Sequence, residues 1–316
     1  MDYFSNLVFM GTSAFAVPAL DALVDSGILP IAVYTQPDRK GGRGRQNLVS
    51  PVKERALHYE LPIVQPETLR AEAELSQFKI LEPSILVVAA YGSILPLEYL
   101  DLLENGGLNI HPSLLPFHRG PSPIVNTILE GDTDAGVSIF LMDEGMDTGP
   151  ILRQKKTPIS LNETGGALTD RLSLEGAKML VPTLHDWTKG EIEPVPQDNN
   201  IATYSNLLKK SDGMLDFKES ALTLKRKIDA FNPWPTTYTT YKGKRLTILE
   251  AWLYDGKGPE IEPGQISHSP PEQKIFLGTG DGILDMRKIQ LEGKRPVDAI
   301  DFLRGYQDFS GSILPS

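Results

Sequence analysis

The sequence predicts an α/β protein in which a mainly parallel sheet is followed by a smaller, β-rich domain. Three observations support this fold class. In the first half, short β-rich apolar runs alternate with amphipathic stretches, which is the pattern of βαβ units. In the second half, the runs become short strands separated by Gly and Pro. The length of 316 residues also exceeds the usual size of a single domain, roughly 100 to 200 residues.

The first half is expected to form a Rossmann-like sheet with helices between its strands. The candidate strands cover residues 7–10, 31–35, 85–90, 107–110 and 137–142. Between the first two, Leu20, Leu23 and Val24 recur at helical spacing. A later helix is expected to begin near Thr164. Its predicted buried face consists of Leu168, Leu172 and Met179.

A polar, proline-rich stretch separates the two halves. Residues 190–200 show no apolar periodicity, which indicates a linker. We therefore expect a first domain over 1–189, a linker over 190–207 and a second domain over 208–316.

The second domain begins with a helical pattern around 221–230 and continues as short strands, such as 246–252 and 274–277. Gly and Pro residues separate these strands. The spacing predicts a small, OB-like β-barrel, although a sandwich fits it nearly as well.

The composition excludes several classes of protein. With 40% hydrophobic and 23% charged residues, the chain has the composition of an ordinary globular protein. No apolar run reaches the roughly 20 residues of a membrane span, and no Lys or Arg precedes Arg39, so we expect neither a span nor a signal peptide. The absence of cysteine excludes disulfides and thiolate chemistry. A cytoplasmic protein is therefore expected.

Two polar side chains follow one another along the fourth candidate strand. Because side chains alternate along a strand, Asn109 and His111 point to the same side. An Asn amide donates a hydrogen bond and a His exchanges a proton near neutral pH, so the pair suits an oxyanion that develops on a carbonyl carbon. A hydrogen-bonded pair at a strand end remains the alternative.

A carboxylate-rich turn follows the next strand, over residues 142–150. It contains Asp143 and Asp147, which the residues alone do not rank. Asp and Gly also form turns for purely structural reasons. The histidines outside the strand are His58, His118, His185 and His268. Their spacing does not match that of metal ligands, so no metal site is expected.

Two segments are basic, although the formal net charge of the chain is −10. Residues 38–55 hold six basic and two acidic residues, and residues 205–250 hold nine basic and five acidic ones. Each segment therefore has a local net charge of +4. The simplest interpretation is scattered surface charge, whereas the alternative is a surface for phosphates.

Five motifs in one order carry a family resemblance. They are Gly11-Thr12, the Thr-Gln-Pro-Asp-Arg run at 35–39 with Gly-Arg-Gly at 42–44, the Asn-Ile-His-Pro-Ser-Leu-Leu-Pro run at 109–116, Met142-Asp143 with Asp147-Thr148-Gly149, and the Phe-Asn-Pro-Trp-Pro run at 231–235. With these motifs, nearly the whole chain resembles the methionyl-tRNA formyltransferases. The 109–116 run marks the wider group of folate-dependent formyltransferases, and the 35–39 run points to the tRNA enzymes.

The resemblance implies a reaction and a site. The formyl group of 10-formyltetrahydrofolate, a co-substrate, would pass to the amine of initiator methionyl-tRNA without a metal. Asn109 and a protonated His111 would stabilise the oxyanion, while Asp147 would orient His111 and help to move protons. Folate would contact Ser113, Leu114, Leu115 and Pro116, together with Ile94 and Leu95. The tRNA would contact Arg39, Lys40, Arg43, Arg45, Lys209 and Lys210.

Two alternatives stay open at this point. A sugar-nucleotide formyltransferase uses the same donor and core, but its acceptor loop should lack the 35–39 run. A non-catalytic RNA-binding protein is the second alternative, and the complete set of Asn109, His111 and Asp147 argues against it. A monomer with no membrane partner is expected.

Overall fold

The computed structural model describes residues 6–41, 46–256 and 259–316, and the chain divides into two compact units. The first unit contains Met1–Pro123, Asp134–Pro158 and Thr169–Ser205, and the second contains Ile124–Thr133, Ile159–Leu168 and Asn206–Ser316. Each unit is described by itself. The sequence predicts a first domain that ends at residue 189 and a second that begins at residue 208, and these bounds remain a prediction.

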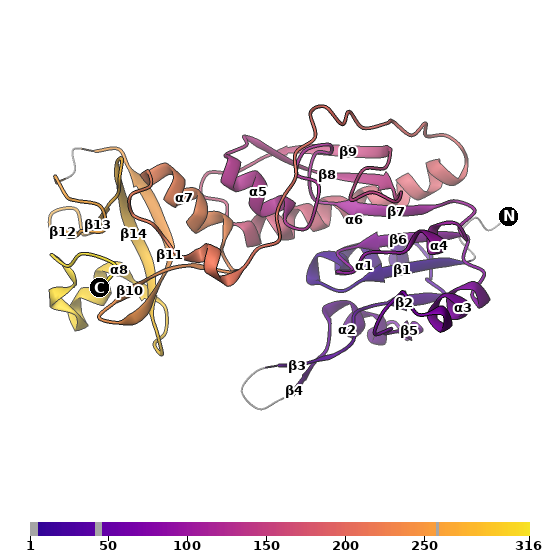
Figure 1. Ribbon diagram of the computed structural model, residues 1–316, viewed down its shortest axis with the longest axis horizontal. Coiled ribbons are helices and arrows are strands. Elements are labelled where there is room, and N and C mark those ends of the chain that lie inside the picture. The colour runs from indigo at the N-terminus through magenta and orange to yellow at the C-terminus, as the bar shows by residue number, and fades with distance from the viewer. Residues whose placement is uncertain (1–5, 42–45, 257–258) are drawn as a thin grey trace. The chain divides into compact units, whose positions relative to one another are not determined.

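The first unit is built on a seven-stranded sheet in the order β5-β2-β1-β6-β7-β8-β9 (Figure 1). The first five strands in this order, β5, β2, β1, β6 and β7, are parallel to one another, whereas β8 and β9 run antiparallel to their neighbours. The predicted mainly parallel sheet is therefore confirmed. All five predicted strands exist, but β5 and β9 were not predicted. The strands are β1 (Leu7–Gly11), β2 (Ala32–Tyr34), β5 (Ile63–Val64), β6 (Ile85–Ala89), β7 (Gly107–His111), β8 (Asp134–Leu141) and β9 (Ile151–Pro158).

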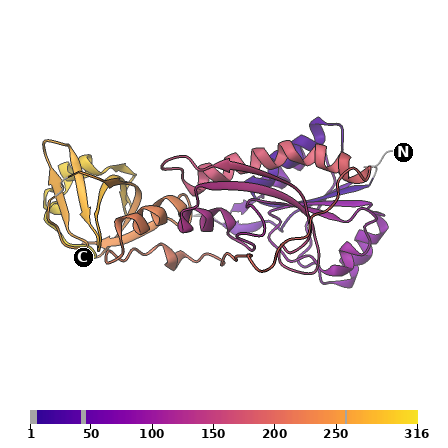
Figure 2. The same ribbon diagram turned by 90° about the horizontal axis from the view of Figure 1, so that it is seen from above.

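Helices cover both faces of this sheet (Figure 2). Consequently β1 and β6 are buried along their whole length and read as continuous apolar runs. One core layer centres on Met10, Tyr34, Phe78 and Tyr99. The helices are η1 (Ala14–Ala16), α1 (Val17–Asp25), α2 (Pro51–His58), α3 (Glu72–Ile80) and α4 (Leu97–Leu100), and a hairpin of β3 (Arg39–Gly41) and β4 (Gln46–Leu48) precedes α2.

Helix α6 (Gly165–Thr188) begins where the sequence predicts it, because Thr164 Oγ1 accepts a hydrogen bond from the Ala167 N–H at 3.2 Å. The predicted apolar face of α6 is buried. At Gly176 a Cβ atom would lie 2.7 Å from the Ile110 side chain, so glycine allows the close approach of α6 to β7. Among the helices that the structure describes, none is long and apolar enough to cross a membrane.

The second unit contains an antiparallel sheet in the order β10-β11-β14-β13-β12, with β15 also paired to β14. Its core includes Ile228, Leu246, Ile275, Leu284 and Phe309. Within the described residues β10 and β12 do not pair, so closure into an OB-like barrel remains a prediction. The strands are β10 (Thr237–Tyr241), β11 (Lys244–Tyr254), β12 (Ile266–Ser269), β13 (Lys274–Gly278), β14 (Ile283–Leu291) and β15 (Val297–Asp298). The helices are α5 (Pro123–Glu130), η2 (Lys210–Gly213), α7 (Ala221–Ala230), α8 (Ala299–Gly305) and η3 (Gln307–Phe309).

Candidate active site

Strand β7 carries the two polar side chains that the sequence predicts on one side. It is parallel to β6 and antiparallel to β8, and it pairs Asn109 with Phe140 and His111 with Ser138. His111 is buried, whereas Asn109 is half-buried. The Asn109 carboxamide makes no hydrogen bond to another residue that the structure describes, so its N–H groups can bind a ligand.

The His111 imidazole is held at both ring nitrogens. Nε2 lies 3.1 Å from the carbonyl oxygen of His118, and because a carbonyl only accepts, Nε2 carries the proton of this hydrogen bond. Nδ1 lies 3.5 Å from Oδ2 of Asp147. The neutral ring therefore turns an unprotonated nitrogen toward a carboxylate, which is the place where a second proton can bind.

The structure distinguishes the two carboxylates of the 142–150 turn. Asp143 Oδ1 accepts hydrogen bonds from the Gly145 N–H at 3.0 Å and from Thr148 Oγ1 at 2.7 Å, so this side chain holds the turn. Asp147 Oδ2 accepts the Gly120 N–H at 2.7 Å and faces His111. Of the two, only Asp147 contacts the imidazole.

Burial and the neighbouring carboxylate act in opposite directions on His111. Burial lowers the pKa of His111 below its ordinary value, because the charged imidazolium loses its hydration. The Asp147 carboxylate and the hydrogen bond to the His118 carbonyl raise the pKa but do not outweigh burial. The free protein therefore holds His111 mainly neutral at neutral pH, whereas the resemblance implied the protonated form.

The turn that carries Asp147 has a demanding backbone. Asp147 itself has φ +56°, in the left-handed region that an aspartate adopts at a cost. At Gly149 a Cβ atom would lie 1.7 Å from the Leu141 carbonyl oxygen, so no side chain fits there. The Asp-Thr-Gly spacing thus has a steric reason as well as a chemical one.

Residues 195–205, which lie in the predicted linker, pair with β9 and with the segment after β7. Val195 forms an isolated β-bridge with Ile151 at the start of β9, and Tyr204 forms one with Arg119. The His118 N–H also donates to Thr203 Oγ1 at 2.8 Å. Sequence patterns missed this docking because backbone bridges and polar contacts hold the segment, and these leave no apolar periodicity.

The segment expected to bind folate is anchored by β8 and β9. Ser113 Oγ donates to the Phe117 carbonyl at 2.6 Å, and the Leu115 N–H donates to Ser138 Oγ at 3.1 Å. Ser113 and Leu115 are buried, whereas Leu114 and Pro116 are half-buried. Any ligand contact through side chains would therefore come from Leu114 and Pro116, and the assignment of this segment remains a prediction.

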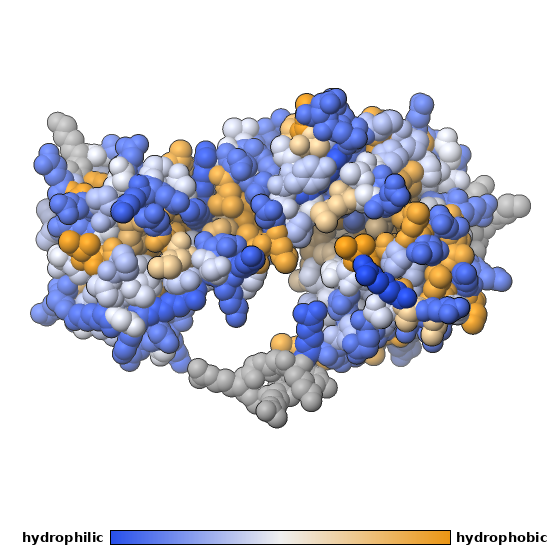
Figure 3. All heavy atoms as spheres, viewed as in Figure 1, coloured by the Kyte–Doolittle hydropathy of each residue, from blue (hydrophilic) through white to orange (hydrophobic). Residues whose placement is uncertain are grey.

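The second expected folate contact precedes α4. Ile94 is 76% exposed, whereas Leu95 is half-buried and packs against the core of the first unit. Figure 3 shows apolar atoms among polar ones over the part of the surface where α3 and α4 lie. An exposed isoleucine can cover a flat apolar ligand, so the prediction for Ile94 fits its position.

The basic segment 38–55 is partly neutralised by its own contacts. Lys53 donates to Asp38 at 2.6 Å, and Arg55 lies 3.5 Å from Asp21. Arg39 is exposed on β3, where Lys40 follows it. Arg43 and Arg45 lie outside the described residues. The local charge of +4 therefore overstates what this segment can offer to phosphates.

In the second unit, too, some basic residues are paired with carboxylates and others are exposed. Lys225, Lys227 and Lys242 form ion pairs with Asp229, Glu219 and Asp308. Lys209 and Lys210 are exposed at the start of η2. The structure thus leaves these two predicted contacts accessible, and their role in binding tRNA stays a prediction.

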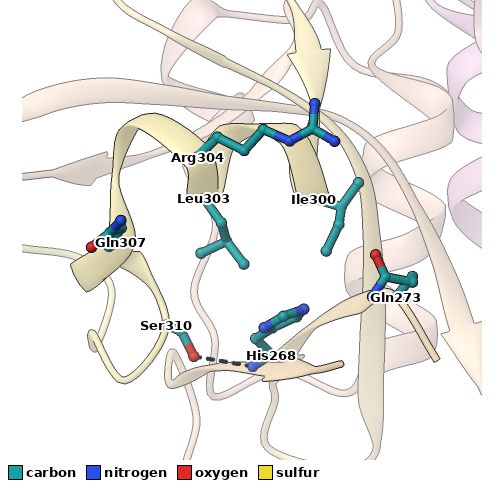
Figure 4. Close-up of a pocket in the computed structure, with 7 residues that line it drawn as sticks. All are labelled: His268, Gln273, Ile300, Leu303, Arg304, Gln307 and Ser310. Atoms are coloured by element: carbon teal, nitrogen blue, oxygen red, sulfur yellow. Dashed lines mark hydrogen bonds between the residues drawn. The ribbon is translucent and has the colours of Figure 1, made fainter. Parts of the chain in front are cut away.

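No group of three or more His, Asp or Glu side chains that could hold a metal ion occurs in the part of the chain that the structure describes. In the second unit, a shallow hollow lies between β12 and α8, and its lining residues are shown in Figure 4. His268 lies on β12 and Leu303 on α8. None of the predicted site residues lines this hollow.

The family models and the curated relatives indicate one family, and a solved structure shares the fold. Residues 5–184 match the family described as "Formyl transferase", and residues 207–307 match "Formyl transferase, C-terminal domain". The methionyl-tRNA formyltransferase of Roseiflexus castenholzii is 41% identical over 98% of both chains, and that of Coxiella burnetii is 42% identical over 96% of both. An N-formyltransferase from Helicobacter canadensis, solved with folinic acid and dTDP-3-aminofucose, shares the fold with a TM-score of 0.63 and 16% identity over 89% of this chain and 98% of that one.

Proposed function

The chain belongs to the methionyl-tRNA formyltransferase family, and we propose that it transfers the formyl group of 10-formyltetrahydrofolate to the α-amino group of initiator methionyl-tRNA. The observation that carries the proposal is the contact of His111 with Asp147. On the same strand lies Asn109, whose amide makes no hydrogen bond to another described residue. This arrangement can stabilise an oxygen that gains negative charge and can also hold a proton.

Asn109 would donate an N–H to the formyl oxygen as the amine attacks the formyl carbon. A donor that the strand holds in place before the reaction would need little reorganisation when the charge develops. The donor folate supplies an activated formyl group. A new bond forms between the amine nitrogen and the formyl carbon, and the bond from that carbon to the folate nitrogen breaks.

His111 and Asp147 would carry the proton that this exchange requires. The attacking amine loses one proton, and the departing folate nitrogen gains one. With Nε2 donating to the His118 carbonyl, the incoming proton would bind Nδ1, where Asp147 balances the new charge. A neutral resting His111, favoured by its burial, is the form that can accept this proton.

The surroundings of the pair fit a flat, partly apolar donor. Phe117 is 42% exposed and directly precedes His118, and Met146 is 55% exposed and directly precedes Asp147. Apolar side chains beside convergent polar groups are typical of small-molecule sites. We propose that Ile94, Leu114 and Pro116 add to this surface.

Arg39 and Lys40 with Arg43 and Arg45 would bind the acceptor RNA, and Lys209 and Lys210 would add contacts from the second unit. Exposed lysines and arginines bind phosphates in this way. We also propose that the chain acts as a cytoplasmic monomer and that its second sheet closes as an OB-like barrel.

One experiment tests the function. The full chain is incubated with 10-formyltetrahydrofolate and either methionyl-tRNA or an amino-sugar nucleotide, and the products are weighed by mass spectrometry. We expect a formyl mass increase on methionyl-tRNA alone. Addition to the sugar nucleotide alone would overturn the acceptor assignment, and addition to neither would overturn the proposed function.

A further inference from the structure

Gln197 connects the docked segment to the turn that carries Asp147. Its Nε2 donates to two carbonyl oxygens, those of Asp147 at 2.9 Å and Gly149 at 2.7 Å. Both residues belong to the turn with the strained Asp147 backbone and the sterically closed Gly149. The two hydrogen bonds therefore hold the backbone from which the Asp147 carboxylate reaches His111.

Arg119 in turn holds Gln197. Its guanidinium donates to Gln197 Oε1 from Nε at 3.0 Å and from Nη2 at 2.8 Å. The remaining donors reach Asn199 Oδ1 at 2.8 Å and the Tyr204 hydroxyl at 3.1 Å. Arg119 is only 1% exposed, and none of its partners among the described residues is a carboxylate.

Burial of a guanidinium without a carboxylate partner costs free energy, and the hydrogen bonds of Arg119 to neutral acceptors offset part of that cost. The planar fork of Arg119 fixes the direction of the Gln197 amide, because both donors meet the same oxygen. That direction leaves the NH₂ group of Gln197 pointing at the two carbonyls. Only a side chain with one acceptor and one donor end, at this length, satisfies both sides.

We infer that Gln197 is a positioning residue, which Arg119 orients, and that it sets the distance between Asp147 and His111. The inference rests on the proposed function for its effect on turnover. The segment 195–205 is therefore a structural wall of the active site rather than a spacer. Loss of the Gln197 donors would let the turn relax, and the carboxylate would move away from the imidazole.

The test compares Gln197→Met, Gln197→Glu and a matched control, Asn200→Ala, in the full chain. Gln197→Met keeps the length but removes both hydrogen-bonding ends. Gln197→Glu keeps an acceptor for Arg119 and gains an ion pair, so it preserves folding, yet it turns an oxygen toward the two carbonyls. Asn200 is exposed in the same segment, and within the part of the chain that the structure describes it bonds only to Asp198.

We expect both Gln197 variants to lower kcat by roughly 10- to 100-fold with the KM of each substrate unchanged, because a misplacement of about 1 Å costs on that scale. NMR titration should show a lower pKa of His111 in Gln197→Met, since the Asp147 charge that raises it would lie farther away. Asn200→Ala should match the wild type in both measurements.

Wild-type kcat in Gln197→Glu, or an unchanged His111 pKa in folded Gln197→Met, would overturn the inference. If the wild type itself fails to formylate methionyl-tRNA, the proposed function is wrong. The NMR comparison still decides the positioning role in that case, because it requires no turnover.

Discussion

Oδ2 of Asp147 lies 3.5 Å from Nδ1 of His111 and accepts the Gly120 N–H at 2.7 Å through the same oxygen. The other nitrogen of the imidazole is already bound to the His118 carbonyl. One carboxylate oxygen thus joins the β7 strand, the loop after it and the 142–150 turn. The chemistry of the proposed reaction depends on this junction.

His111→Ala should lower the formylation rate about 100- to 1,000-fold, within the usual effect of losing a general acid or base. The measurement is kcat with saturating methionyl-tRNA and folate donor. His58→Ala is the matched control, because this histidine is exposed at the end of α2 and should leave kcat unchanged. Unchanged turnover in His111→Ala would remove this residue from the reaction.

Asp147→Asn should lower turnover on the order of 100-fold and change the pH dependence. The Asp147 charge raises the pKa of His111, so its removal should lower that pKa further. The acidic limb of the kcat profile, where His111 becomes protonated, should therefore move to lower pH. Asp143→Asn should leave the limb in place, since among the described residues Asp143 bonds only within its turn. A shift to higher pH in Asp147→Asn would contradict the arrangement.

Gly149→Ala should destabilise the first unit by about 3 kcal/mol, the upper end of the usual cost of overpacking, because its Cβ would overlap the Leu141 carbonyl and the backbone would have to move. Chemical denaturation with urea measures the free energy of unfolding. Gly305→Ala is the control, since a Cβ atom there meets nothing within 4 Å. Equal stability of the two variants would show that the turn is not sterically closed.

Arg39→Ala should weaken tRNA binding and leave folate affinity unchanged, because Arg39 is exposed on the β3–β4 hairpin. The slope of log K against log salt should fall by about 1 if one phosphate contact is lost. We expect the same of Arg43→Ala. Lys79→Ala, exposed at the end of α3, tests for a general charge effect and should change neither quantity. Selective loss of folate binding in Arg39→Ala would contradict the assignment of the hairpin.

Much of the fold could be predicted because strand and helix periodicity are local. Short β-rich apolar runs located β1, β2, β6, β7 and β8 to within a few residues. Strand β9 was missed because four of its residues, Arg153 to Lys156, are charged or polar, and no apolar alternation marks an edge strand of this kind. The family motifs then predicted the donor and acceptor, which periodicity does not encode.

The sequence by itself determined that Asn109 and His111 face the same side of a strand, because side-chain alternation depends only on the backbone of that strand. Which carboxylate reaches the imidazole was a different matter, since Asp143 and Asp147 occur in one turn and have the same chemistry. Tertiary structure decided it, through contacts among Gly120, Asp147 and Gln197. These residues are far apart in the chain, and a hydrogen bond between distant segments leaves no periodic trace in the order of the residues.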